Sequence, residues 1–60
     1  MTKKFLTLNE LAEYLKLPRG TIYSWRARNY GPRSHKVGGA VRYDIADVEK
    51  WLQGTIEHNR

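Results

Sequence analysis

The sequence predicts a mainly α-helical domain that carries one short β-hairpin. Apolar residues recur at the spacing of an amphipathic helix in three separate stretches. The predicted helices cover residues 8–15, 19–28 and 45–53. Between the last two, β-prone segments flank Gly38 and Gly39, which is typical of a hairpin with a two-residue loop, here over residues 34–43. The expected order is helix, helix, hairpin, helix.

Length and composition indicate a single binding domain. The chain has 60 residues, and a chain of this size buries only about 60% of the surface that it exposes when unfolded. It has no cysteine for disulfides or thiolate metal sites, and no apolar run long enough for a signal peptide or a membrane span. We expect one cytoplasmic domain over residues 1–60, with a flexible arm at residues 1–4 and a flexible tail at residues 55–60.

The first two helices have clear boundary signals. Thr7 and Glu10 have the spacing of a capping box, in which each side chain bonds the backbone N–H of the other residue. Pro18 separates the helices, because proline disfavours helical geometry in the residue before it and suits the start of a new helix. The turn cluster at residues 29–32 stops the second helix. These signals predict two helices joined by a tight turn.

The third helix and the core follow from the same patterns. Asp44 is expected to cap the start of the third helix. The expected core residues are Phe5, the leucines, Ile22, Trp25, Val37, Val41, Val48 and Trp51. In the hairpin, the inward residues would be Val37, Val41 and Tyr43, and the outward ones Lys36 and Arg42.

Charge is concentrated in the middle of the chain. The formal net charge is +5, yet no aspartate or glutamate occurs between Leu15 and Tyr43. The basic residues of this acid-free stretch are Lys16, Arg19, Arg26, Arg28, Arg33, Lys36 and Arg42. A segregated basic surface on a small domain is the electrostatic footprint of a phosphate-binding protein. The alternative is a solvated basic face that only keeps the protein soluble.

The second helix has the composition of a helix that enters a DNA groove. Ile22 and Trp25 define its buried side. The opposite face carries Gly20, Tyr23, Ser24 and Ala27, with Arg19, Arg26 and Arg28 on the flanks and Thr21 closer to the core. Small side chains let the backbone approach a groove floor, and arginines can reach phosphates or guanine edges. We expect Arg19, near the helix start, to contact bases, and Arg26 and Arg28 to contact phosphates.

The hairpin would act as a wing beside this helix. Two helices joined by a tight turn and followed by a hairpin form a winged helix-turn-helix, which binds duplex DNA. Lys36 and Arg42 are the expected phosphate contacts of the wing. Its tip, Gly38 and Gly39, offers only backbone to the DNA.

No other chemistry is indicated by the sequence. His35 and His58 have no carboxylate or cysteine pattern beside them, so we predict no metal site. There is no spacing typical of a nucleophile with its base, and no glycine loop that would cradle a phosphate cofactor. We expect no enzymatic activity, no cofactor and no small-molecule ligand.

These residues resemble a known family, the small winged helix-turn-helix domains of the excisionase, AlpA-like and MerR-related superfamily. The stretches that carry the resemblance are Leu8 to Leu15, Thr21 to Trp25, Lys36 to Gly39, Val41 to Tyr43 and Asp47 to Leu52. The resemblance implies that the second helix enters the major groove and that the wing contacts the adjacent backbone or minor groove. Ser24 on the second helix and Gly39 and Ala40 at the wing tip stand where relatives often carry arginine. Because the wing tip lacks these arginines, Lys36 and Arg42 would carry more of the wing contact.

The resemblance also implies two main roles. Excisionases bind repeated sites side by side, bend the DNA and steer an integrase toward excision, whereas other members regulate transcription. Residues 53–60 are too short for the coiled coil through which effector-sensing MerR-type regulators dimerise. We therefore expect an excisionase, with duplex DNA, an integrase and further copies of itself as partners. A small transcription regulator is the first alternative, and an interaction adaptor with a basic face is the second.

Overall fold

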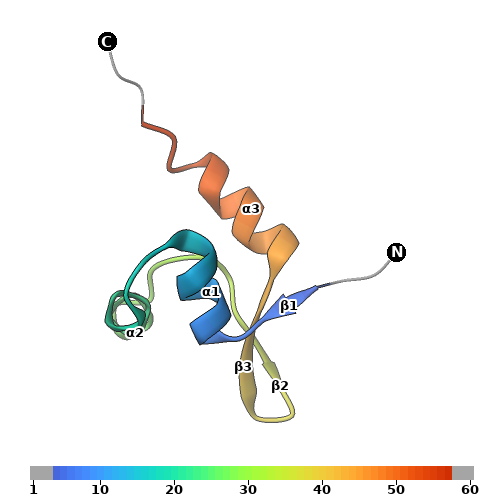
Figure 1. Ribbon diagram of the computed structural model, residues 1–60. Helices are drawn as coiled ribbons and strands as arrows, with labels where there is room; N and C mark the ends of the chain where they lie inside the picture. Colours follow the sequence, from blue (N-terminus) through green and yellow to red (C-terminus); the bar gives the residue numbers. More distant parts are fainter. Residues whose placement is uncertain (1–3, 58–60) are drawn as a thin grey trace.

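The computed structural model describes residues 4–57 and shows a winged helix-turn-helix (Figure 1). Its elements are β1 (Phe5–Leu6), α1 (Leu8–Leu15), α2 (Arg19–Ala27), β2 (His35–Val37), β3 (Ala40–Asp44) and α3 (Ile45–Gln53). The predicted helices and hairpin are confirmed, with α2 one residue shorter than expected. No helix within residues 4–57 has the length and apolar character needed to cross a membrane.

Both ends of α1 are fixed by local hydrogen bonds, and the second end forms the turn to α2. The capping box is confirmed: Thr7 Oγ1 accepts from the Glu10 N–H at 3.0 Å, and Glu10 Oε1 accepts from the Thr7 N–H at 2.8 Å. At the other end of α1, Lys16 adopts a left-handed conformation with φ of 60°. The Leu17 N–H then donates to the Ala12 carbonyl at 2.9 Å, which closes the helix in the manner of a Schellman motif. Pro18 follows as the N-cap of α2.

The chain leaves α2 through a turn that folds over Trp25. The Tyr30 N–H donates to the Trp25 carbonyl at 2.8 Å, and Asn29 has a positive φ of 57°. Gly31 has a φ of 102°, and a Cβ at this position would lie 3.0 Å from Trp25 Cε3. Both the backbone conformation and the nearby ring therefore require glycine.

The strands form an antiparallel sheet in the order β1-β3-β2. Sequence reasoning missed β1, because two residues are too few to show the alternation that marks a strand. Phe5 and Leu6 pair with Asp44 and Tyr43, and the Lys4 carbonyl accepts from the Ile45 N–H at 2.9 Å. The rest of the predicted arm, residues 1–3, and residues 58–60 of the predicted tail lie outside the described part of the chain.

The hairpin register corrects the predicted faces of the wing. The two-residue loop has positive φ at both Gly38 and Gly39, and it pairs Lys36 with Val41. Partners across an antiparallel ladder lie on the same face of the sheet, so odd residues of β2 share a face with even residues of β3. The prediction that Lys36 and Arg42 share an outward face was therefore wrong. Lys36 lies on the face of Val41, whereas Arg42 lies on the opposite face.

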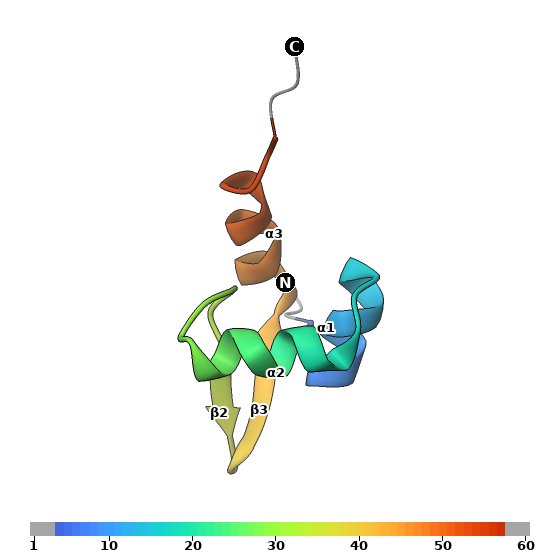
Figure 2. The ribbon, with the colours of Figure 1, turned by 90° about the vertical axis from the view of Figure 1, so that its left-hand side faces the viewer.

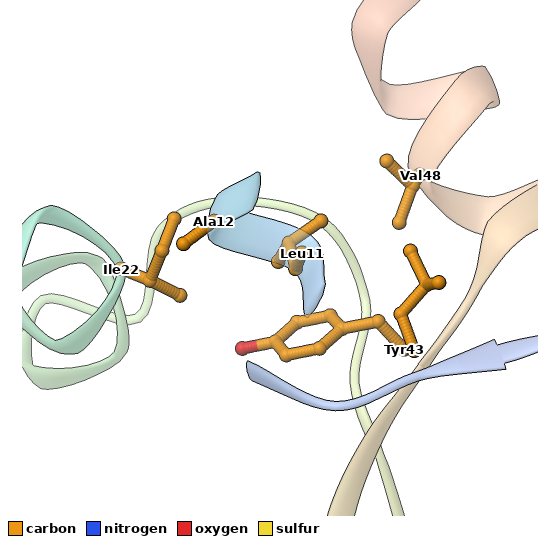
Figure 3. Packing of buried hydrophobic residues seen from close by; sticks show 6 residues of the cluster. Leu11, Ala12, Ile22, Tyr43 and Val48 are labelled. Carbon is orange, nitrogen blue, oxygen red and sulfur yellow. The ribbon is translucent and has the colours of Figure 1, made fainter. Parts of the chain in front are cut away.

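The core lies where α1, α2, α3 and the sheet meet (Figure 3). Its buried residues are Leu6, Leu11, Ala12, Ile22, Tyr43 and Val48. Three predicted core residues are exposed instead: Val37 at 53%, Phe5 at 40% and Leu17 at 37%. Val37 pairs with Ala40 at the tip of a wing that extends beyond the helices, so nothing covers it (Figure 1). Phe5 lies edge-on against His35, with ring centroids 5.8 Å apart, and stays at the margin.

The tryptophans form a second, half-buried cluster beside the core. The rings of Trp25 and Trp51 are 5.3 Å apart between centroids, and Tyr30 stacks edge-on against both, at 5.5 and 5.8 Å. This cluster ties the end of α2 to α3. The sequence indicated both tryptophans as core residues but did not show that Tyr30 joins them.

Candidate nucleic-acid interface

The interface predicted on α2 is exposed along the whole helix. Ile22 is the one α2 residue that is fully buried, and Thr21 and Trp25 are half-buried. The exposed residues are Arg19, Gly20, Tyr23, Ser24, Arg26 and Ala27, followed by the C-cap Arg28. Tyr23 has 60% of its surface exposed. Figure 2 shows α2 lying across the front of the molecule, where no other element covers it. The structure thus brings every predicted α2 residue to the expected side of the helix.

The wing lies next to the C-terminal half of α2. A guanidinium nitrogen of Arg26 is 3.4 Å from Ser34 Oγ and 3.5 Å from the Tyr43 hydroxyl, which connects α2 to the base of the hairpin, where the chain enters β2 and leaves β3. In Figure 2 the hairpin extends below this end of the helix. Helix and wing therefore present one continuous surface.

The two predicted wing cations differ in their surroundings. Lys36 is exposed on the face of the sheet that carries Tyr43, which packs toward α1 and α2. Arg42 is half-buried on the other face, and its guanidinium donates to the carbonyl of Val41 at 2.8 Å. The structure therefore places Lys36, but not Arg42, on the side of the sheet that faces α2.

No acidic side chain neutralises the arginines of this surface. Within residues 4–57, Arg19, Arg26 and Arg28 form no ion pair, and Arg28 lies over the Tyr30 ring with its guanidinium carbon 5.7 Å from the centroid. An unpaired guanidinium keeps its donors available for a ligand anion.

Nothing in the folded protein requires a glycine at position 20 of α2. A Cβ built on Gly20 would meet nothing within 4 Å, and its φ is not in the left-handed region. A helical glycine is less stable than alanine by roughly 0.5–1 kcal/mol. Gly20 therefore carries a cost that no internal contact explains, in contrast to Gly31.

The acidic groups lie away from this surface and make their own contacts. The Tyr14 hydroxyl on α1 donates to Glu49 Oε2 on α3 at 3.2 Å. This hydrogen bond, with smaller contributions from desolvation and from the carboxylate charge, raises the pKa of Tyr14 above its usual value. His35 on β2 contacts Asp47 on α3, with 3.1 Å between Nε2 and Oδ2. These two contacts hold α3 against α1 and against the wing.

Sequence reasoning missed the carboxylates around His35. Ligand-type atoms of His35, Asp44 and Asp47 lie within 4.8 Å of one another, although these residues are well separated in sequence. Asp44 Oδ1 also accepts from the Ala46 N–H at 2.9 Å, which confirms it as the N-cap of α3. The cluster is explained by this cap and by the His35–Asp47 pair. That no metal binds here stays a prediction.

Other residues beside the interface were also missed. Arg33 and Ser34 lie on the connection from α2 to β2, and they border the same recess as Arg26 and the Tyr43 hydroxyl. Arg33 had a signal, because it lies in the acid-free stretch. Ser34 and Tyr43 had none, because only the folded chain brings their hydroxyls to α2.

Comparison with known proteins identifies the family. The helix-turn-helix domain family matches residues 5–55, which cover all the elements described above. No curated protein and no solved structure gives a significant match to the chain. Since the family match covers most of the sequence, the protein belongs to the helix-turn-helix domain family and is a DNA-binding protein.

Proposed function

We propose that this protein is an excisionase, also called a recombination directionality factor. It binds repeated sites on double-stranded DNA, bends the DNA and directs an integrase toward excision. The observation that carries the proposal is the way α3 ends, because effector-sensing members of the resembled superfamily need a long dimerisation helix beyond the winged helix.

The end of α3 is closed by its own backbone. The Gly54 N–H donates to the Trp51 carbonyl at 3.0 Å, and both the N–H and the hydroxyl of Thr55 donate to the Leu52 carbonyl, at 3.0 and 2.8 Å. The helix therefore stops at Gln53, after nine residues. Within residues 4–57, no further helix follows α3. This supports a module that binds DNA through α2 and the wing.

A single small module gains affinity from neighbours. One helix and one hairpin offer few contacts, and joining binding events on adjacent sites raises the overall affinity without any new contact to DNA. Side-by-side binding of several copies on repeated sites would supply this gain. It would also bend the DNA over a longer segment than one copy covers.

In the proposed complex, α2 lies in the major groove. Gly20, Ser24 and Ala27 allow a close approach, Tyr23 extends toward the bases, and Arg19 reads base edges from the start of the helix. Thr21, Arg26 and Arg28 lie beside this strip, and Arg26 and Arg28 reach phosphates. Lys36 holds the adjacent backbone, and Gly38 and Gly39 let the wing tip approach it. Arg42, on the far face and bonded to Val41, supports the strand more than it contacts DNA.

The experiment that tests the proposal is an excision assay with a candidate integrase from the genome that encodes this protein. Integrated attachment sites are the substrate, and excised circles are counted with and without the protein. Excision should depend on the protein, and footprints should cover adjacent repeats. Arg19→Ala should lose both, whereas Lys50→Ala on α3 serves as the matched control. If excision does not change while the protein represses or activates a nearby promoter, the transcription regulator is the correct role. A lack of salt-dependent binding to any duplex would instead favour the interaction adaptor.

A further inference from the structure

We propose that a recess between the end of α2 and the wing binds one phosphate of the DNA backbone. The recess has a volume of about 430 Å³, and its lining includes Arg26, Tyr30, Gly31, Arg33, Ser34 and Tyr43. The inference rests on DNA binding, which it makes more specific, and it does not depend on the excision role. It assigns a binding function to Arg33, Ser34 and the Tyr43 hydroxyl, none of which was among the DNA contacts predicted from the sequence.

Two weak hydrogen bonds hold the Arg26 guanidinium at the recess and leave most of its N–H donors unused. Its two bonds, 3.4 Å to Ser34 Oγ and 3.5 Å to the Tyr43 hydroxyl, are longer than the usual 2.7–3.2 Å of an N–H···O bond. A guanidinium has five N–H donors, and these weak bonds occupy one nitrogen. A phosphate in the recess would accept from the guanidinium at shorter distances, and the two hydroxyls could also donate to it.

Tyr43 gives the recess a fixed hydroxyl. Only 2% of Tyr43 is exposed, and its ring packs in the core beside Leu11. Figure 3 shows the ring crossing from β3 toward α2, with the oxygen at the end that points to Ile22. A hydroxyl that the core holds in place loses no side-chain freedom when an anion binds.

Arg33 supplies a second cation without an internal partner. It is exposed, and within residues 4–57 it makes no hydrogen bond or ion pair. It also borders a smaller recess with Asp47, but that carboxylate is bonded to His35. The turn that carries Arg33 is fixed by the bond from the Tyr30 N–H to the Trp25 carbonyl and by the packing of Gly31 against the Trp25 ring.

The position of the recess indicates which anion it binds. In the proposed complex, α2 occupies the major groove and the wing meets the adjacent backbone, so a DNA strand passes between them. The recess lies at this joint. Lys36 lies on β2 two residues after Ser34, and it is on the face of the sheet that carries Tyr43, the other hydroxyl of the recess. Arg26, Ser34 and Lys36 thus form a track along which successive phosphates can lie. A free phosphate ion could bind the same donors in the recess. Unlike a DNA strand, it would not also place a second phosphate at Lys36.

The test is a methylphosphonate scan on a short duplex selected by the wild-type protein from a random pool. Each substitution makes one backbone phosphate neutral. The wild type should lose affinity at one phosphate between the α2 contacts and the wing contacts. Arg33→Gln should lose less than the wild type at that phosphate, because one of its contacts is already absent while Arg26 still reaches it. Losing one contact should reduce the slope of log affinity against log salt by about 0.9, equivalent to about eightfold between 1 M and 0.1 M salt.

Two further variants and a control complete the design. Tyr43→Phe keeps the buried ring and removes only the hydroxyl, so it should weaken binding a few-fold on all sequences without changing the salt slope. Lys50→Gln removes the same charge as Arg33→Gln, but on α3, and should respond to every methylphosphonate as the wild type does. Inorganic phosphate at the concentration of the buffer salt should compete no better than sulfate, because the full site includes the next phosphate on Lys36.

The outcomes separate this inference from DNA binding itself. If Arg33→Gln and each methylphosphonate reduce the affinity independently at every position, Arg33 does not contact any of these phosphates. The recess is then not the phosphate site, although the protein still binds DNA. Saturable competition by inorganic phosphate alone would also overturn the inference in favour of a small-anion site. If the wild type selects no duplex from the pool, DNA binding and the inference fail together.

Discussion

Two glycine-to-alanine substitutions should have opposite effects on stability, although the chemical change is the same. Gly31→Ala places a side chain at φ of 102°, which costs roughly 1–2 kcal/mol for a residue with a Cβ. The new Cβ would lie 3.0 Å from Trp25 Cε3, and the ring cannot retreat easily because Trp51 and Tyr30 pack against it. Overpacking of this kind costs about 1–3 kcal/mol. The expected loss in the free energy of unfolding is therefore about 2–5 kcal/mol.

Gly20→Ala is the matched control. Its Cβ would meet nothing within 4 Å, so the variant should be more stable than the wild type by up to about 0.5–1 kcal/mol. Natural domains are stable by roughly 0.05–0.15 kcal/mol per residue, or about 3–9 kcal/mol for this chain, so Gly31→Ala would remove a large share.

Urea unfolding followed by far-UV circular dichroism measures both variants, and an unchanged m-value would show that both unfold from a native-like state. A loss below about 1 kcal/mol in Gly31→Ala would show that the turn relaxes away from Trp25 and would refute this reasoning. In the DNA-binding assay, Gly20→Ala should bind more weakly despite its greater stability, since the glycine is explained by a ligand. Equal or tighter binding would remove that explanation.

Three further predictions concern helix capping, DNA contacts and one tyrosine. Thr7→Ala should reduce the free energy of unfolding by about 1 kcal/mol, measured in urea, because the Glu10 N–H loses its acceptor. Arg19→Ala should relax sequence preference in a selection experiment, while Lys36→Ala should weaken binding to all duplexes alike and reduce the salt slope by about 0.9; a uniform loss in Arg19→Ala would contradict base reading. Glu49→Gln should lower the pKa of Tyr14 toward its usual value in an NMR titration. Because the pKa of Tyr14 is raised in the folded protein, the Tyr14–Glu49 bond stabilises the protein at pH values below the unfolded pKa of about 10. This stabilisation is lost as the pH rises through the folded pKa of Tyr14. The wild type and Glu49→Gln should therefore converge in stability in alkaline solution.

The sequence predicted more of the α2 surface than of the wing. On a helix, the position of each residue around the axis follows from its number once Ile22 and Trp25 mark the buried side, so all the exposed α2 residues were placed correctly. In a hairpin, the faces depend on the register across the loop. The pairing of Lys36 with Val41 reversed the predicted face of β2, and this separated Lys36 from Arg42.

The sequence by itself determined the elements, their order and the concentration of positive charge. Capping residues, proline, glycine pairs and helical periodicity act over a few neighbouring residues, and charges are visible in the sequence wherever they lie. Only the tertiary structure decided which groups meet. It brought the Tyr43 hydroxyl and Ser34 to Arg26, placed Asp47 against His35, and added β1 to the sheet. Such contacts join residues that are distant in the chain, and their geometry depends on how the helices and the sheet pack around the shared core.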